Sequence, residues 1–342
     1  MHFQHTNSEG RSTVLILNST AVSLALPMNE AIEAMKQAYA AVSAGKVEMP
    51  IRAHLPIEPH TGVSLFMPAF LQTEHGDALG VKVVSLFNGN PSKGLSTIQA
   101  AVLMLNEKTG QALALLEGST LTAIRTGAGS GAATDILARQ DSSTLAIFGA
   151  GVQARSHLEA ICTIREIETV WIYSPTRENA EALIEEMAGH APIPSNMRVA
   201  ASPSEALKDA DIVCTTTTSH TPVFAASDLK SGAHVNAVGS YTPEMQEIPA
   251  EMLSEALIVI DEMESSMEEA GDLLIPIAQG IISQDNIHAE LGEIVLGKKP
   301  GRTSPDQLTF FKTVGIAAQD AMAGKLALEN AQAMDLGQQV DF

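Results

Sequence analysis

The sequence predicts an α/β protein in which a domain with a parallel sheet follows a region of strands and helices. The chain has 342 residues, a length typical of about two domains. Between residues 50 and 118, short apolar runs alternate with turn residues, which is typical of a meander of strands. From residue 145, apolar strands alternate with segments of helical periodicity, which indicates right-handed βαβ units and a parallel sheet.

The first third of the chain begins with a strand and an amphipathic helix. Residues 13–17 (Thr-Val-Leu-Ile-Leu) have the apolar and β-branched composition of a strand. From Asn29, apolar residues recur at helical spacing until Gly45 ends the run. The strands of the meander are expected over residues 64–67, 79–86, 100–106 and 112–116.

The remaining elements follow from the change of pattern near residue 122. The Ala- and Gly-rich run 122–137 predicts a closely packed helix. Strands are then expected over 145–148, 170–173, 212–216, 235–238 and 257–261, with helices over 152–162 and 178–187. A last helix over about 307–330 lies beyond the alternation, and we expect it to return to the first domain.

Charge and cysteine content exclude several classes of function. Lys and Arg number 20 against 40 Asp and Glu, a formal charge of −20, which opposes binding to nucleic acid or anionic membranes. The two cysteines, Cys162 and Cys214, have no neighbours at metal-ligand spacing, so neither a disulfide framework nor a metal site is expected. No run of about 20 apolar residues predicts a spanning helix. We therefore expect a cytoplasmic protein with a small-molecule partner.

A glycine-rich loop lies between a predicted strand and a predicted helix. The segment 149–154 has the form G-x-G-x-x-A. In this pattern the first glycine permits a tight turn, the second lets the backbone approach a pyrophosphate, and the small last residue lets helix and strand pack closely. The loop predicts a dinucleotide site with contacts from Gly149, Gly151, Val152 and Gln153. The alternative is an ordinary turn between a strand and a helix.

The end of the next predicted strand bears on the choice of cofactor. NAD-selective sites usually place an acidic residue there, about 20 residues after the glycines. The sequence has Ser174, Thr176 and Arg177 instead, and their hydroxyls and guanidinium suit a 2′-phosphate. NADPH is therefore the expected cofactor, with NADH as the second candidate. The alternative for Arg177 is a solvated residue in the first turn of a helix.

Several blocks of the sequence resemble one family. Residues 121–134, 148–154, 301–304 and 309–315 are similar to blocks of the ornithine cyclodeaminase and mu-crystallin family, and the similarity extends from about residue 13 to 335. The resemblance implies a Rossmann domain (122–307) inserted into an N-terminal α+β substrate and dimerisation domain (1–121), which the C-terminal helix completes (308–342). It also implies a homodimer that binds NAD(H) or NADP(H) and acts on small amino or imino acids.

Three cationic residues lie in blocks that match the family's substrate contacts. Lys82 lies in an otherwise apolar strand, where an unpaired buried ammonium is costly. Arg52 and Arg125 can bind a carboxylate bidentately. The resemblance therefore implies that all three bind substrate, with Lys82 as the catalytic residue. The alternatives are a surface charge for Lys82, a loop salt bridge for Arg52, and an ion pair with Glu117 for Arg125.

Further contacts are expected from the same resemblance. Thr97 lies in a block that lines the substrate site of relatives, although some relatives have His where Ile98 stands. The predicted cofactor contacts in the resembling blocks also include Thr126, Val238, Gly239 and Ser240.

Tyr241 marks a departure from the family. It occupies the place of the aspartate that handles protons in the cyclodeaminases, and a phenol of pKa about 10 is a poor base near neutral pH. Cyclodeamination is therefore disfavoured, and the resemblance implies NAD(P)H-dependent reduction of a cyclic imino acid such as Δ1-pyrroline-2-carboxylate. The alternatives are an alanine-type dehydrogenase, an ornithine cyclodeaminase, and a nucleotide-dependent binding protein similar to mu-crystallin.

Overall fold

The computed structural model describes residues 13–74 and 76–342, which form two compact units. The first unit comprises Met1–Arg125 and Ile316–Phe342, and the second comprises Thr126–Gly315. Residues 1–12 of the first predicted domain lie outside the described residues. The observed boundaries differ from the predicted ones at residues 122 and 308. The difference is clearest at residue 308, because the segment after it begins with a strand of the second unit's sheet.

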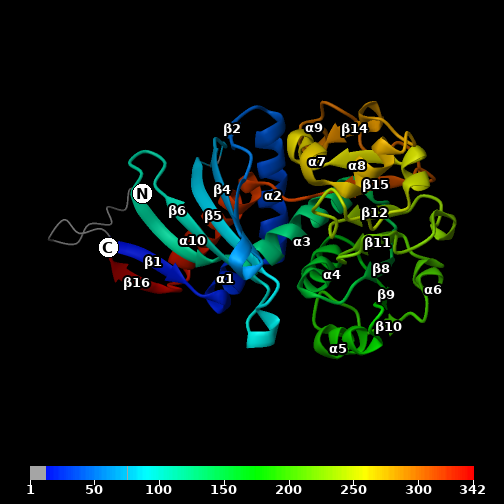
Figure 1. Ribbon diagram of the computed structural model, residues 1–342, viewed down its shortest axis with the longest axis horizontal. Helices are drawn as coiled ribbons and strands as arrows, with labels where there is room; N and C mark the ends of the chain where they lie inside the picture. The colour runs from blue at the N-terminus through cyan, green and yellow to red at the C-terminus, as the bar shows by residue number, and fades with distance from the viewer. Residues whose placement is uncertain (1–12, 75) are drawn as a thin grey trace. The chain divides into compact units, whose positions relative to one another are not determined.

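The first unit is built on an eight-stranded sheet with the order β16-β1-β7-β6-β5-β4-β2, in which β3 also pairs with β4 (Figure 1). The pairing of β1 with β7 is parallel, and the other pairings are antiparallel. Its strands are β1 (Thr13–Leu17), β2 (Val47–Glu48), β3 (Ala53–Ile57), β4 (Gly62–Leu71), β5 (Ala78–Phe87), β6 (Ile98–Leu105), β7 (Ala112–Glu117) and β16 (Gln338–Asp341). The predicted meander is thus confirmed.

Helices cover one face of this sheet. They are α1 (Ser19–Ala25), α2 (Met28–Ser43) and α10 (Ala317–Ala333), with the short 3-10 helices η1 (Glu58–His60) and η2 (Pro91–Lys93) in loops. The helix α10 packs against α2 and against β4, β5 and β6. Along β5, buried and half-buried side chains alternate, because Lys82 and Val84 point to the helix-covered face.

The C-terminal helix begins later than the sequence predicted. Residues 309–312, which the prediction placed in a helix over 307–330, form strand β15 (Thr309–Lys312), and all four are buried. The chain then turns through Gly315, whose φ is +79°, and α10 begins at Ala317. The prediction was wrong here because a short, fully buried strand has no alternation that distinguishes it from part of a buried helix.

The second unit contains an eight-stranded sheet in which every described pairing is parallel. Its order is β10-β9-β8-β11-β12-β15-β13-β14 (Figure 1). The strands are β8 (Thr144–Phe148), β9 (Thr169–Tyr173), β10 (Met197–Val199), β11 (Ile212–Thr215), β12 (His234–Ala237), β13 (Leu257–Ile260), β14 (Ile287–Glu290) and β15. The predicted parallel sheet is confirmed, and the sequence missed β10, β14 and β15.

The helices of the second unit include those that the sequence predicted and several shorter ones. They are α4 (Val152–Ile164), α5 (Arg177–Met187), α6 (Pro203–Leu207), α7 (Met263–Glu269), α8 (Gly271–Ala278) and α9 (Leu291–Val295), with the 3-10 helices η3 (Ala226–Asp228), η4 (Ala250–Ser254) and η5 (Gln284–Asn286). The helix α3 (Gly118–Leu137) starts in the first unit and ends in the second.

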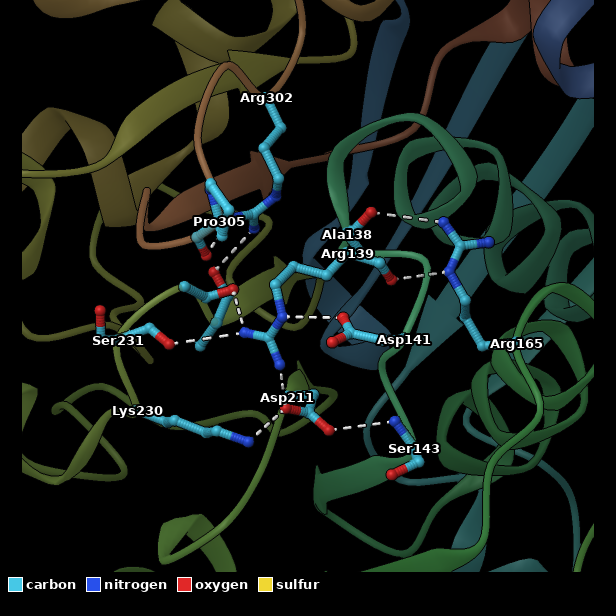
Figure 2. A network of polar contacts seen from close by, with 12 residues as sticks. Ala138, Arg139, Asp141, Ser143, Arg165, Asp211, Lys230, Ser231, Arg302 and Pro305 are labelled. Carbon is cyan, nitrogen blue, oxygen red and sulfur yellow. Dashed lines mark hydrogen bonds and ion pairs between the residues drawn. The ribbon is translucent and has the colours of Figure 1, made fainter.

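Arginine side chains anchor the end of α3 at the amino edge of the parallel sheet (Figure 2). Arg165 Nε donates to the carbonyl of Arg139 at 3.0 Å, and Arg302 Nε donates to that of Leu137 at 2.6 Å. Arg139 itself donates to Asp211 at 2.5 Å, and Asp211 also pairs with Lys230 at 2.6 Å. The bond from Arg302 satisfies a carbonyl group that the end of α3 leaves without a partner. The resembling block at 301–304 therefore has a structural role.

Candidate functional site

The order of strands in the second unit defines where a nucleotide can bind. The chain runs from β8 outward through β9 to β10, and then returns to β11 on the other side of β8. This reversal makes the carboxyl ends of β8 and β11 a topological switch point, where open α/β sheets bind their ligands. The glycine-rich loop follows β8 directly, so the predicted dinucleotide loop lies at the switch point.

Gly149 makes the tight turn that the loop requires. Its φ is +104°, a conformation that residues with a side chain rarely adopt. A Cβ at this position would lie 2.8 Å from the Oγ1 atom of Thr216, in the loop after β11. The residue is therefore required both for the turn and for the close contact between the two loops.

The start of α4 is open toward solvent. A Cβ on Gly151 would meet no atom within 4 Å, and Val152 is 65% exposed. Gly151 is the N-cap residue and has no side chain to bond the first N–H groups of α4. These N–H groups and the positive end of the helix dipole suit a pyrophosphate. The residues of the loop therefore fit a dinucleotide.

The residues predicted to select the cofactor lie after β9. Arg177 is the first residue of α5, and its side chain is 61% exposed and pairs with Glu181 at 2.7 Å. The Oγ atom of Ser174 accepts the N–H of Thr176 at 3.3 Å. The three residues thus follow the carboxyl end of β9, and their contact with a 2′-phosphate stays a prediction.

The other predicted cofactor residues are buried, except Gly239, which is half-buried. Thr126 is 7% exposed within α3, and Val238 follows β12 directly. A Cβ on Gly239 would overlap the backbone of Thr217, so a glycine is required for the loops after β11 and β12 to meet. The hydroxyl of Ser240 is buried and donates to the carbonyl of Met245 at 2.8 Å.

Lys82 is a buried cation at the centre of the first unit. It lies on β5, which is flanked by β4 and β6, and its side chain is 2% exposed. The alternative of a surface charge is therefore wrong. Its Nζ atom lies 2.7 Å from Oδ2 of Asp320, on α10. Asp320 is equally buried, so the two opposite charges neutralise each other away from water.

Asp320 also binds Arg125, which joins the same cluster. The Nε atom of Arg125 donates to Oδ1 of Asp320 at 3.0 Å. Glu117, the alternative partner of Arg125, instead accepts the N–H groups of Ser119 and Thr120 at 2.8 and 2.9 Å, at the start of α3. The carboxylate of Asp320 therefore bridges the two cations that the sequence assigned to substrate binding.

Hydrogen bonds through Gln319 fix Arg125 in place. Its Nη1 atom donates to Oε1 of Gln319 at 3.0 Å, and Oε1 also accepts the N–H of Ile316. Gln319 Nε2 donates to the hydroxyl of Tyr39 at 2.8 Å. Because two of the guanidinium nitrogens are engaged by protein acceptors, Arg125 can present Nη2 to a ligand in a fixed orientation.

Burial lowers the pKa of Lys82 from 10.5 to about 7. The negative charge of Asp320 opposes this change, whereas the positive charges of Arg125 and Arg52 add to it. An amine with this pKa can donate or accept a proton near neutral pH, as general acid–base catalysis requires. Perturbed groups of this kind occur frequently at functional sites.

The remaining substrate candidates are Arg52 and Thr97. Arg52 precedes β3 and is half-buried, and its charge acts on Lys82. Thr97 follows the turn between β5 and β6, where its carbonyl accepts the N–H of Phe87 at 2.9 Å, at the end of β5. Contact of Thr97 with the substrate stays a prediction.

Sequence reasoning missed Asp320, Gln319 and Tyr39. Asp320 lies 195 residues from Arg125 along the chain, so no local spacing connects them. Both residues on α10 follow the resembling block 309–315 closely, which is the signal that could have found them.

Metal-binding clusters and membrane-spanning helices are absent from the described residues. Over 13–74 and 76–342, no group of three His, Cys, Asp or Glu side chains could hold a metal ion. Within the same ranges, no helix is long and apolar enough to span a lipid bilayer.

Comparison with known proteins identifies relatives that match nearly the whole chain. The model of the ornithine cyclodeaminase/mu-crystallin family matches residues 13–335. A Δ1-pyrroline-2-carboxylate reductase from Bacillus cereus is 41% identical over 330 residues, which cover 96% of this chain and 100% of the relative.

Two solved structures have similar folds. One is Δ1-pyrroline-2-carboxylate reductase from Thermococcus litoralis in complex with NADH and L-proline, with a TM-score of 0.90, 40% identity, and coverage of 96% of this chain and 100% of that one. The other is an archaeal alanine dehydrogenase dimer with bound NAD, with a TM-score of 0.89, 33% identity, and coverage of 96% and 99%. The predicted fold class and the predicted resemblance are confirmed.

Proposed function

Because the chain belongs to the ornithine cyclodeaminase/mu-crystallin family, we propose that it reduces a small cyclic imino acid with a nicotinamide cofactor. The proposed substrate is Δ1-pyrroline-2-carboxylate, which becomes L-proline, and Δ1-piperideine-2-carboxylate, which gives L-pipecolate, is the alternative with a larger ring. The similarity to the reductases of Bacillus cereus and Thermococcus litoralis supports this choice.

The observation that carries the proposal is the buried cluster of Lys82, Arg125 and Asp320. The substrate combines an anionic carboxylate with a C=N bond whose nitrogen must gain a proton. Arg125 offers Nη2, and Arg52 adds a second positive charge that acts on the same region. Arginine suits a carboxylate because its N–H groups match the two oxygens. Both are proposed to bind the carboxylate.

Lys82 is proposed as the proton donor. The bound nicotinamide supplies the hydride that reduces the imine carbon. Lys82 then provides the proton that the nitrogen requires, directly or through a water molecule, and its pKa of about 7 makes it competent near neutral pH. Asp320 is a positioning residue, because it holds the Lys82 ammonium at 2.7 Å and fixes the orientation of Arg125.

NADPH is the proposed preferred cofactor. Arg177, Ser174 and Thr176 support it, because they place a guanidinium and two hydroxyls at the carboxyl end of β9, where an acidic residue would favour NADH. NADH remains the second candidate, since the similar Thermococcus litoralis structure contains it.

The proposal includes assembly as a homodimer through the uncovered face of the first unit's sheet. Leu55, Phe66 and Leu115 are 52%, 38% and 39% exposed on this face, opposite the face that packs on α10. An apolar sheet face of this kind is typical of an interface between subunits. A second copy of this chain is the proposed occupant, because the similar archaeal alanine dehydrogenase is a dimer.

We also propose that the protein works in a reducing compartment, the cytoplasm. Cys162 and Cys214 are both buried free thiols, and burial raises the pKa of each to about 12. Such thiols are unreactive, and the described fold needs no disulfide.

Lys82→Met tests the proposed role of Lys82. The variant removes the ammonium and keeps an unbranched apolar chain, so turnover of Δ1-pyrroline-2-carboxylate should be lost while NADPH binds within a few-fold of wild type. Lys36→Met is the matched control, because Lys36 lies on α2 and pairs with the exposed Glu33 at 2.6 Å. Turnover near the wild-type rate in Lys82→Met would remove Lys82 from the mechanism.

A further inference from the structure

Glu247 is a fully buried carboxylate that accepts three hydrogen bonds from side chain and backbone donors. Its Oε2 atom accepts from the hydroxyl of Thr215 at 2.9 Å and from the N–H of Gly239 at 2.7 Å. Its Oε1 atom accepts from the N–H of Thr217 at 2.6 Å. A buried polar group that loses such a partner pays the cost of leaving water without compensation. Glu247 therefore ties together two segments that are separated in sequence.

These two segments are the loops at the nucleotide-binding edge of the parallel sheet. Thr217 lies in the loop after β11, on one side of the switch point, and Gly239 lies in the loop after the neighbouring strand β12. The loop after β11 also touches Gly149 of the glycine-rich turn. Ligands of such sheets bind outside these strand ends. The loops that Glu247 joins therefore form a wall of the predicted dinucleotide site.

Glu247 is itself held in place by a buried ion pair. Oδ1 of Asp272, at the start of α8, accepts the N–H groups of Glu247 and Ile248 at 2.7 and 3.0 Å. Oδ2 of Asp272 accepts from Nζ of Lys312 at 3.1 Å, and both side chains are 0% exposed. The ion pair neutralises Asp272, and burial raises the pKa of the Glu247 carboxyl. A buried carboxyl group is costly unless its hydrogen bonds are kept.

We propose that Glu247 is a positioning residue for the nicotinamide cofactor. Glu247 holds the loops after β11 and β12 in the conformation that binds NADPH or NADH. The inference rests on the proposed function, since it concerns the same cofactor. Glu247 lies behind the loops and has no open surface, so it acts through Thr217 and Gly239. Its removal should weaken cofactor binding without changing the affinity for the imine.

Glu247→Gln is the test variant. The amide keeps the shape of the side chain but replaces one of the two carboxyl oxygens with an NH₂ group. Because this NH₂ group cannot accept a hydrogen bond, the backbone N–H of one of the two loops loses its acceptor. We expect the dissociation constant for NADPH, measured by fluorescence titration, to rise at least about fivefold. The KM for Δ1-pyrroline-2-carboxylate at saturating NADPH should stay within about twofold of wild type.

Asp261→Asn is the matched control. Asp261 is 1% exposed in the same unit and accepts the N–H groups of Val314 and Gly315, each at 2.8 Å, beside β13 and away from the switch point. The Asp261→Asn variant should have a lower melting temperature than wild type and an unchanged dissociation constant for NADPH. If the two variants lose comparable stability and both bind NADPH as wild type does, the positioning role of Glu247 is overturned.

A milder pair of variants decides the question if Glu247→Gln fails to fold. Thr215→Val removes only the hydroxyl that donates to Glu247, whereas Thr215→Ser keeps it. We expect Thr215→Val to bind NADPH about threefold more weakly than Thr215→Ser. Equal affinities overturn the inference. If the wild-type protein binds neither NADPH nor NADH, the proposed function fails. If wild type and variant bind the cofactor equally, only the positioning role of Glu247 fails.

Discussion

Asp320→Asn tests how the buried cluster controls the proton on Lys82. The variant keeps the shape of the side chain and an oxygen that can accept from Arg125, but it removes the negative charge 2.7 Å from Lys82 Nζ. Coulomb's law with an effective dielectric constant of about 20 gives about 6 kcal/mol for charges at this distance. At about 1.4 kcal/mol per pKa unit this corresponds to roughly 4 units. Because relaxation and water entry reduce the effect, we expect a fall of at least about one unit.

The expected change in activity follows from the fraction of protonated Lys82. With a pKa of about 7, about half of the Lys82 side chains are protonated at pH 7 in the wild type. With a pKa about one unit lower, about one tenth are protonated. Since the proposed donor must be protonated, kcat/KM for the imine at pH 7 should fall at least about fivefold, and the decline of activity with rising pH should begin about one unit earlier.

The assay is kcat/KM for Δ1-pyrroline-2-carboxylate at saturating NADPH, from about pH 5 to about pH 9. The circular dichroism spectrum and the NADPH dissociation constant establish that the variant is folded. Glu33→Gln is the control, because it breaks the surface ion pair with Lys36 and should leave the pH profile unchanged. If Asp320→Asn and wild type lose activity over the same pH range, Asp320 does not set the pKa of the proton donor.

Three other predictions concern the cofactor, the interface and the stability of the fold. Arg177→Gln should raise the KM for NADPH about tenfold and leave the KM for NADH within about twofold; an equal rise for both cofactors would exclude a contact with the 2′-phosphate. Phe66→Glu should convert a dimer into a monomer in size-exclusion chromatography with light scattering, and a dimeric variant would place the interface elsewhere. Arg302→Met should lower the free energy of unfolding in urea by about 2–4 kcal/mol, because it removes donors to the end of α3. The exposed Lys208 gives the control Lys208→Met, and a similar loss in both variants would contradict the anchoring role.

The sequence predicted most of the elements whose signals are local. β1 has the predicted bounds, Thr13–Leu17, and the glycine-rich loop lies between β8 and α4 as expected. Alternation of apolar residues and turn chemistry act over a few residues, so one sequence is enough to locate them. The segment 309–312 was misassigned because its burial comes from β12 and β13, its neighbours in the sheet.

The candidate site could be predicted only in part, for a related reason. Lys82 and Arg125 were found because they lie in blocks that match the family's substrate contacts, and Lys82 also because it lies in an apolar strand. Their partner Asp320 lies on a distant helix. Glu247 gave no signal either, since in an acidic chain one more carboxylate is expected at the surface. Only the fold shows that the Glu247 carboxylate is buried against three donors.

The most direct test of the proposed activity is oxidation of NADPH by the purified protein with Δ1-pyrroline-2-carboxylate. The same preparation is assayed with pyruvate plus ammonia, and with ornithine and NAD. The account predicts rapid turnover with the cyclic imine alone and formation of L-proline. Faster turnover with pyruvate plus ammonia would identify an alanine-type dehydrogenase, and release of ammonia from ornithine would identify a cyclodeaminase; either result would contradict the proposed function.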